Sequence, residues 1–162
     1  MQSWNPWHGC HKISEGCQNC YVYRTDSRYG KDSGKVEKTS NFDMPLNRDR
    51  SGEWKLQNDG FAVATCLTSD FFIDEADQWR SDIWQIIKRR RDLDFFIITK
   101  RIHRFYEGLP EDWGNGYDNV IIGCTCECQR TADFRLPIFL EAPIKHKVIT
   151  VSYTHLRAHE TP

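Results

Sequence analysis

Three cysteines near the amino terminus have the spacing of a metal-binding loop. Cys10, Cys17 and Cys20 form the pattern C-x6-C-x2-C within the segment WNPWHGCHKISEGCQNCY. Three thiolates from one loop suit an iron–sulfur cubane in which one iron keeps an open coordination position. The proline and glycines of this segment favour an irregular loop, which leaves the thiols free to turn toward a common centre.

A structural zinc ion is a second interpretation of the same cysteines. Zinc takes four ligands in tetrahedral geometry, and thiolate and imidazole groups are among its usual ligands. His8 or His11 would then supply the fourth ligand. A third interpretation is that the cysteines bind nothing and lie in an ordinary loop. The spacing alone leaves the three interpretations open.

A second group of cysteines alternates along the chain at Cys124, Cys126 and Cys128. Alternate residues of a β-strand point to one face of the sheet, so a strand here would place the three thiols together. With Cys66 on a neighbouring strand they would form a second metal site. The alternative is that the group is part of a core, because free cysteine packs as a small hydrophobic residue. Cys128 lies nearest the strand end and is the best placed to reach a functional site.

The elements that would position these residues alternate between strands and helices. Short apolar runs predict strands, and apolar residues at helical spacing predict helices. We expect strands at 61–67, 94–99, 119–127 and 147–151, and helices at 19–29, 74–91, 103–107 and 131–140. Residues 1–20 are predicted to be irregular, and residues 30–60 to form a long surface connection. Apolar strands that alternate with helices indicate an α/β fold with a parallel sheet.

Polar residues follow several of these strands, at the expected carboxyl edge of the sheet. Binding and catalytic sites form at this edge in barrels and in open parallel sheets. We therefore predict five cofactor or substrate contacts there: Ser69, Asp70, Lys100, Thr125 and Glu127. Each type has an ordinary alternative. The serine–aspartate pair suits a turn or helix cap, Lys100 and Arg101 suit a solvated helix start, and Glu127 suits a surface salt bridge.

Composition indicates a single domain from a reducing, cytoplasmic environment. The chain has 162 residues and seven cysteines, an odd number that argues against a fully paired disulfide framework. The first residues lack the apolar stretch of a secretory signal, and no apolar run approaches the ~20 residues of a membrane span. A net charge of −1 gives no overall attraction to nucleic acid or membranes. The basic run at 88–91 is best explained as a solvated helix end, although it leaves nucleic acid open as a partner.

The segment 152–162 breaks the alternating pattern. It has no apolar face, follows a strand without a closing helix, and is typical of translated adapter sequence. A natural tail is the alternative. We therefore expect an incomplete (β/α) domain over residues 1–151, a non-native tail over 152–162, and a gene product that continues beyond Val151.

Several segments together resemble a phage-associated family of uncharacterised proteins that has a three-cysteine motif and is similar to radical S-adenosylmethionine (SAM) enzymes. These segments are WNPWHGC…SEGCQNCY, TSDFF, ITKR, NVIIGCTCE and QRTADFRLP. The resemblance covers residues 4–151. It implies a partial, radical-SAM-like (β/α) barrel of parallel strands whose C-terminal part is missing. It also implies a [4Fe-4S] cluster on Cys10, Cys17 and Cys20, with SAM at the open iron, although the spacing differs from the common C-x3-C-x2-C.

The expected function is therefore that of an iron–sulfur protein, a cytoplasmic radical SAM-type enzyme of unknown substrate. The alternative is a zinc-binding, phage-associated module with a structural or nucleic-acid-processing role, which acts beside a partner protein from the phage or a neighbouring gene. The resemblance also favours simple packing for the second cysteine group, because family members carry other residues at those positions.

Overall fold

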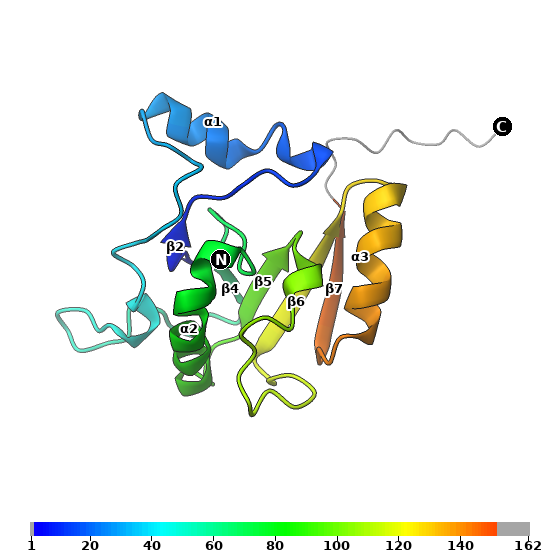
Figure 1. Ribbon diagram of the computed structural model, residues 1–162. Helices are drawn as coiled ribbons and strands as arrows, with labels where there is room; N and C mark the ends of the chain where they lie inside the picture. Colours follow the sequence, from blue (N-terminus) through cyan, green and yellow to red (C-terminus); the bar gives the residue numbers. More distant parts are fainter. Residues whose placement is uncertain (1, 152–162) are drawn as a thin grey trace.

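Five parallel strands form the central sheet, in the order β1-β4-β5-β6-β7 (Figure 1). The computed structural model describes residues 2–151. The strands of this sheet are β1 (Ser3–Trp4), β4 (Val63–Thr65), β5 (Phe95–Thr99), β6 (Val120–Cys126) and β7 (His146–Val151). The prediction of an α/β fold with a parallel sheet is confirmed. Residues 152–162, for which the sequence predicts a non-native tail, lie outside the described residues.

Within residues 2–151, three α-helices accompany the sheet: α1 (Tyr21–Arg28), α2 (Asp77–Arg89) and α3 (Gln129–Glu141). Helix α2 connects β4 to β5, and α3 connects β6 to β7, so each is the crossover of a parallel strand pair. All three lie within or close to predicted helical segments. The segment predicted to be helical at 103–107 instead contains a short 3₁₀ helix, Ile102–Arg104. Helix α3 continues through Pro137, which costs it one backbone donor.

The predicted strand at 61–67 is shorter in the structure, because its ends differ in environment from its centre. Val63, Ala64 and Thr65 are buried between neighbouring strands, whereas Phe61 is 67% exposed. Residues 3 and 4, which the sequence placed in an irregular segment, form the edge strand β1 beside β4. Two residues give too little periodicity to predict a strand, and pairing with β4 determines their conformation.

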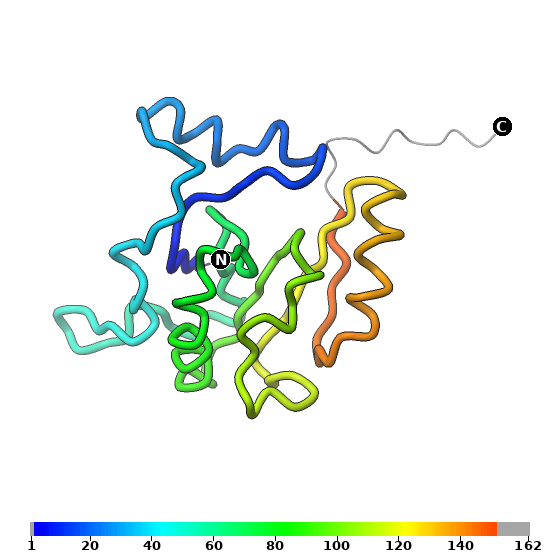
Figure 2. Tube along the Cα trace, viewed as in Figure 1, coloured from blue at the N-terminus to red at the C-terminus, as the bar shows by residue number. Residues whose placement is uncertain are grey.

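The amino-terminal segment runs away from β1, crosses the carboxyl edge of the sheet, and returns through a long connection (Figure 2). On the way out it forms β2 (Trp7–His8), which pairs antiparallel with β3 (Glu37–Lys38) in the returning chain. Helix α1 lies between these two strands in the sequence, and the loop that precedes it passes above the ends of β5 and β6 (Figure 1). The cysteine loop is therefore held over the edge where the strands end. The connection is also anchored to the core, through Phe42 and Leu56.

An aromatic core fixes the segment that follows β4. The ring centroid of Phe71 lies 4.9 Å from that of Trp84 of helix α2 and 5.5 Å from that of Trp7. The guanidinium of Arg80 is fully buried and donates hydrogen bonds to the carbonyl oxygens of Phe71, at 3.1 Å, and Ile73, at 2.8 Å. Buried carbonyl groups need such partners, so Arg80 determines the path of the chain next to the predicted site.

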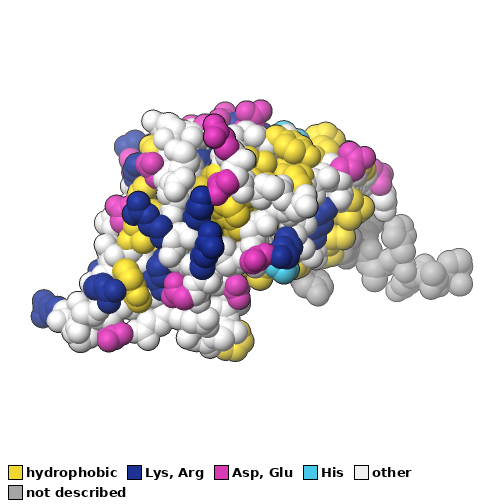
Figure 3. Space-filling view, turned by 90° about the horizontal axis from the view of Figure 1, so that it is seen from below, with side chains coloured by type: hydrophobic (Ala, Val, Ile, Leu, Met, Phe, Trp, Pro, Cys, Tyr) yellow, Lys and Arg dark blue, Asp and Glu magenta, His cyan; other side chains and the backbone are white. Residues whose placement is uncertain are grey.

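Two residues of the basic run at the end of α2 form ion pairs or hydrogen bonds within the fold. Arg90 is buried and donates to the carbonyl oxygen of Leu56 at 2.8 Å and to Asp92 at 2.7 Å, while Lys88 pairs with Asp112. Seen from below, Lys and Arg side chains are interspersed with Asp and Glu (Figure 3). Within residues 2–151, no helix combines the length and the apolar character needed to cross a membrane.

Candidate functional site

A cavity of about 540 Å³ lies at the carboxyl edge of the sheet, beneath the amino-terminal segment. Cys10, Cys17 and Cys20 line it from above. From below it is lined by residues at or just after the ends of four strands: Cys66, Leu67, Thr68, Ser69, Asp70, Ile98, Thr99, Lys100, Arg101, Thr125, Thr150 and Val151. Its volume is typical of a small-molecule or cofactor site. The fold thus brings the cysteine loop and most of the predicted contact residues to one place.

The cysteine loop begins at a glycine with a demanding conformation. Gly9 has φ of +96°, and a Cβ atom there would overlap the carbonyl oxygen of Lys35 and lie 2.7 Å from its carbon. The hydroxyl of Ser69 donates to the Gly9 carbonyl oxygen, and the hydroxyl of Tyr23 donates to that of Cys10. These two hydrogen bonds therefore hold the backbone at Gly9 and Cys10, and the side chain of Cys10 lines the cavity.

The other two cysteines lie at the ends of short helical elements. Cys17 ends the 3₁₀ helix Glu15–Cys17, and Cys20 is the N-cap residue of α1, with extended backbone angles. All three thiols are free and partly exposed. Among residues 2–151, no three His, Cys, Asp or Glu side chains converge closely enough to hold an ion as they stand. Binding of a single metal ion would therefore require the loop to close around it.

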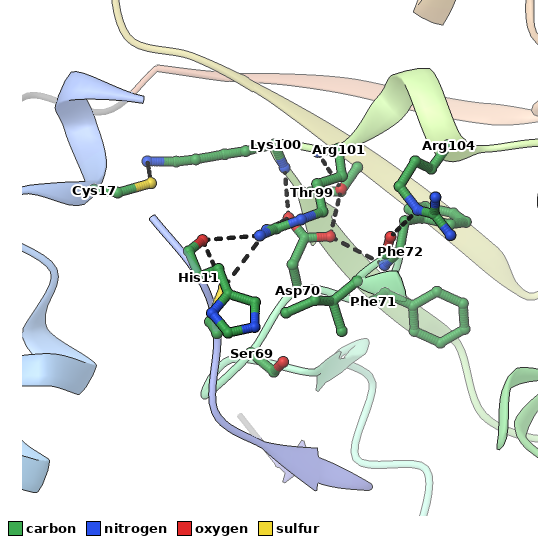
Figure 4. A network of polar contacts seen from close by, with 12 residues as sticks. His11, Cys17, Ser69, Asp70, Phe71, Phe72, Thr99, Lys100, Arg101 and Arg104 are labelled. Atoms are coloured by element: carbon green, nitrogen blue, oxygen red, sulfur yellow. Dashed lines mark hydrogen bonds and ion pairs between the residues drawn. The ribbon is translucent and has the colours of Figure 1, made fainter. Parts of the chain in front are cut away.

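Arg101 connects a buried carboxylate to the Cys10 thiol (Figure 4). Its Nη1 atom lies 3.5 Å from the sulfur of Cys10 and 3.5 Å from Asp70 Oδ2. The Asp70 carboxylate also accepts hydrogen bonds from the Thr99 hydroxyl at 2.7 Å, and from the backbone amides of Phe72 at 3.0 Å and Lys100 at 2.9 Å. These contacts fix the turn after β5, so that Arg101 faces the loop.

Lys100 connects a second buried carboxylate, that of Glu127, to the Cys17 thiol. Its ammonium lies 3.8 Å from the Cys17 sulfur and 2.9 Å from Glu127 Oε1. Glu127 also accepts from the Ser14 hydroxyl at 2.5 Å and from Arg135 Nη1 at 2.5 Å. Two consecutive residues after β5 thus place one cation beside each of two thiols, and the two cations pair with different buried carboxylates.

The two thiols differ in acidity. Burial raises the pKa of Cys10 to about 11, and the neighbouring Arg101 only partly opposes this effect. For Cys17, burial also acts to raise the pKa. There, however, hydrogen bonds from the loop backbone and from Ser14, together with the charge of Lys100, outweigh it and leave the pKa below its usual value.

Four of the five predicted contact residues line the cavity, and Glu127 does not. Ser69 and Asp70 follow β4, Lys100 follows β5, and Thr125 lies on β6 with its hydroxyl 2.9 Å from that of Thr150. Glu127 lies behind the loop with its side chain 2% exposed. A Cβ atom on Gly16 would lie 2.5 Å from Glu127 Cγ, so Gly16 allows the loop to pass this close. Glu127 therefore anchors the cysteine loop to the sheet.

The two histidines suggested as zinc ligands are directed elsewhere. His8 Nε2 lies 2.8 Å from Asp26, and His11 pairs with Glu75 on the protein surface. Neither lines the cavity, whereas Cys66 does. Cys66 is 2% exposed, and burial raises the pKa of its thiol. Of the other cysteines and histidines considered as metal ligands, Cys66 is therefore the one that shares the cavity with the loop cysteines.

The second cysteine group lies in the core and at a helix start. Cys124 and Cys126 are buried on β6, and Cys128 is the N-cap residue of α3, where its sulfur lies 3.7 Å from the Thr131 hydroxyl. None of the three lines the cavity that contains Cys66. The placement agrees with the packing interpretation and does not bring the four thiols together.

Sequence reasoning missed Ser14 and Arg135, the residues that complete the Glu127 anchor. Arg135 is 3% exposed on α3 and also donates to the Thr125 carbonyl oxygen at 2.6 Å. A charged residue within a helix is usually solvated, so the sequence offers no sign that this one is buried. The sequence signals this ion pair only through the eight-residue separation between Glu127 and Arg135. That separation predicts a contact only when a strand-to-helix turn is known to lie between the two residues.

The anchor predicts a specific dependence of stability on acid. Although burial acts to raise it, the pKa of Glu127 falls to about 2, because Ser14, Lys100 and Arg135 stabilise the carboxylate. In the unfolded chain a glutamate titrates near ~4.3. The stabilisation, about 3 kcal/mol, is therefore complete above pH ~4.3 and is lost as the pH falls toward the folded value.

Urea unfolding of the metal-free protein at several pH values measures this effect. The stability difference between the wild type and Glu127→Gln should shrink between pH ~4.3 and the folded pKa of about 2. Glu111→Gln, which changes an exposed carboxyl, should follow the wild type throughout. Parallel curves for the wild type and Glu127→Gln would show that this carboxylate does not carry the acid sensitivity.

Comparison with known proteins identifies a family that covers the whole of the described residues. A search of curated proteins and a search of solved structures each gave no match. The model of one family matches residues 1–153, which include the cysteine loop, every strand of the sheet and the cavity. The chain therefore belongs to the family described as protein of unknown function (DUF5131).

Proposed function

We propose that this protein is an iron–sulfur protein that holds a [4Fe-4S] cluster on Cys10, Cys17 and Cys20 and acts as a radical SAM-type enzyme of unknown substrate. The observation that carries the proposal is the position of the three cysteines. They line a single cavity at the carboxyl edge of a parallel sheet, where α/β folds form their sites. Three thiolates leave one iron of a cubane open for a further ligand.

The electrostatics of the cavity support a cluster held by thiolates. A cubane bound by three thiolates is anionic, and hydrogen bonds to its sulfur ligands help to determine its properties. Lys100 and Arg101 already lie within 3.8 Å and 3.5 Å of two of the sulfurs. The side chain of Arg101 is buried and that of Lys100 is partly buried, so water screens their charges less than it would at the surface.

The strand order supports the finer proposal of a partial (β/α) barrel. In such barrels each strand lies beside the preceding one, and a helix on the outer side connects them. The main strands follow this rule from β4 to β7, and β1 adds to the free side of β4. The amino-terminal cysteine loop then covers the end of the barrel at which active sites form.

The remaining cavity residues leave room and polar groups for SAM. When bound, the cluster would supply the electron that cleaves the sulfonium of SAM. The chain's part is to bind and orient: the Ser69 hydroxyl keeps free acceptor capacity, and the Thr125–Thr150 pair keeps one hydroxyl proton to donate. The Asp70 carboxylate is already engaged by four donors, so we assign it a positioning role instead of a direct contact.

Anaerobic reconstitution with iron and sulfide tests the proposal. The wild-type protein should turn brown and absorb broadly near ~400 nm, as iron–sulfur proteins do. Cys17→Ala should lose this absorption, because it removes one of three ligands. Cys128→Ala, which changes a thiol outside the cavity, should keep it. Reductive cleavage of SAM to 5′-deoxyadenosine then tests the chemistry.

A zinc-binding module with a structural or partner-binding role is the second candidate, and the presence of Cys66 in the same cavity favours it. A Cys66→Ser variant separates the two candidates. A three-cysteine cluster should keep its absorption in this variant, whereas a four-cysteine zinc site should lose most of its affinity for zinc. A colourless wild-type protein that contains one stoichiometric zinc would overturn the iron–sulfur proposal.

A further inference from the structure

A second cavity, of about 270 Å³, lies beside the cysteine cavity and shares Lys100 with it. It opens between the segment that follows β5 and helix α3. Its walls combine basic and apolar side chains, and the residues that carry the argument are Ile13, Lys100, His103, Arg130, Phe134 and Arg135. It is separate from the cysteines, since none of the three lines it.

Positive charge dominates this cavity. Lys100 and Arg135 share a single carboxylate, that of Glu127, which lies with its side chain buried. Arg130 pairs with Glu15 at 2.8 Å, but both side chains are well exposed and a surface pair of this kind is weak. One positive charge therefore remains in excess at the wall shared with the cysteine cavity, and Arg130 can turn inward at little cost.

The imidazole ring of His103 lines the same cavity and can donate a hydrogen bond to a ligand. Within residues 2–151 its ring makes no hydrogen bond, and it lies 5.8 Å from the ring of Phe134. His103 is exposed overall, but partial burial of its ring and the neighbouring charges of Arg101, Arg104 and Arg135 lower its pKa. An anion bound beside it would offset those charges and favour the protonated ring, which donates from both nitrogens.

We propose that this cavity binds the phosphate or carboxylate group of a small molecule, with His103 and Arg130 as direct donors and Lys100 at the boundary with the cysteine cavity. The apolar side chains of Ile13 and Phe134 would contact the organic part of the ligand. The volume suits an anionic group on a small body, just below the usual range for drug-sized ligands. That the ligand is the enzyme's substrate rests on the proposed function, whereas anion binding itself does not.

Titration of the metal-free protein with inorganic phosphate, and separately with acetate, tests this site. The ring signals of His103 are followed by NMR at constant ionic strength, with those of the exposed His146 as an internal reference. We expect a saturable shift of the His103 signals and a rise in the pKa of His103 with at least one anion. The anion that binds more tightly identifies the class of ligand group.

Variants decide whether the binding belongs to this cavity. Arg130→Gln should weaken binding by about tenfold, the usual effect of losing one charge-assisted hydrogen bond. His103→Gln should weaken it similarly, with the change read from the backbone amide of Phe134. Arg89→Gln, which removes an exposed cation from the far end of α2, should leave binding unchanged.

Two results would overturn the proposal. One is a linear, unsaturated response of His103 to both anions. The other is a saturable response that Arg130→Gln and His103→Gln leave unchanged. Since the titration uses metal-free protein, a failure to assemble a cluster would not affect its outcome, and the two proposals can fail separately.

Discussion

An Asp70→Ala variant is expected to lose about 3–5 kcal/mol of its free energy of unfolding. The substitution removes the acceptor of the Thr99 hydroxyl and of two backbone amides, and it leaves the guanidinium of Arg101 without its buried counter-charge. Removing one partner of a buried ion pair costs far more than the pair contributes, because the remaining charge stays out of water. Arg101 is 6% exposed and cannot reach solvent without moving the turn after β5.

Urea unfolding of the metal-free protein measures this loss. Asp70→Asn should lose less than the alanine variant, since the amide oxygen still accepts from Thr99 and Phe72. Asp82→Ala, which removes an exposed carboxylate of α2, should change stability by no more than ~0.5 kcal/mol. If Asp70→Ala were as stable as Asp82→Ala, the network in Figure 4 would contribute nothing to the fold.

A Gly9→Ala variant is expected to lose about 2–5 kcal/mol of its free energy of unfolding, and most of its capacity for metal. Part of the loss, about 1–2 kcal/mol, comes from the positive φ of this residue. A further ~1–3 kcal/mol comes from the contact between the new Cβ and the backbone carbonyl of Lys35, which belongs to the chain returning to β3. The backbone can relieve this contact only by moving away, and Cys10 then moves with it.

Gly52→Ala is the matched control for this substitution. Gly52 has φ of +88°, but a Cβ atom there would have no neighbour within 4 Å. Gly52→Ala should therefore lose only the stability that the positive φ costs, and it should keep the metal-dependent absorption of the wild type. Equal losses in the two variants would mean that the close approach between Gly9 and Lys35 is unimportant. Chemical denaturation and iron content after reconstitution are the two measurements.

The sequence was sufficient to predict the parts of the fold that have a strong local signal. Helix α2 begins and ends with charges that match its dipole, and its apolar residues recur at helical spacing. The strands β5 and β6 are continuous apolar runs, as expected where both faces of a parallel sheet are covered. Polar residues after these strands then predicted where a cavity would form.

The contacts that organise the site had no such local signal. Glu127 and Ser14 are 113 residues apart, and only the folded chain brings them together. A sequence also gives no indication of which of several carboxylates will be buried, so Glu127 was predicted as a ligand contact whereas the structure places it behind the loop. From the sequence, His8 was a possible metal ligand beside Cys10. In the structure the backbone turns at Gly9, so the two side chains point in different directions, and His8 pairs with Asp26.

The two adjacent cations after β5 restrict how this region can change in length. Lys100 and Arg101 contact different sulfurs and pair with different carboxylates, so neither can shift along the chain without displacing the other. One inserted or deleted residue within β5 would also turn its side chains to the opposite faces of the sheet. The exposed turn at residues 49–53 has no such tie to the site. We therefore expect insertions and deletions to be tolerated in that turn, and the number of residues from Phe95 to Arg101 to be constant.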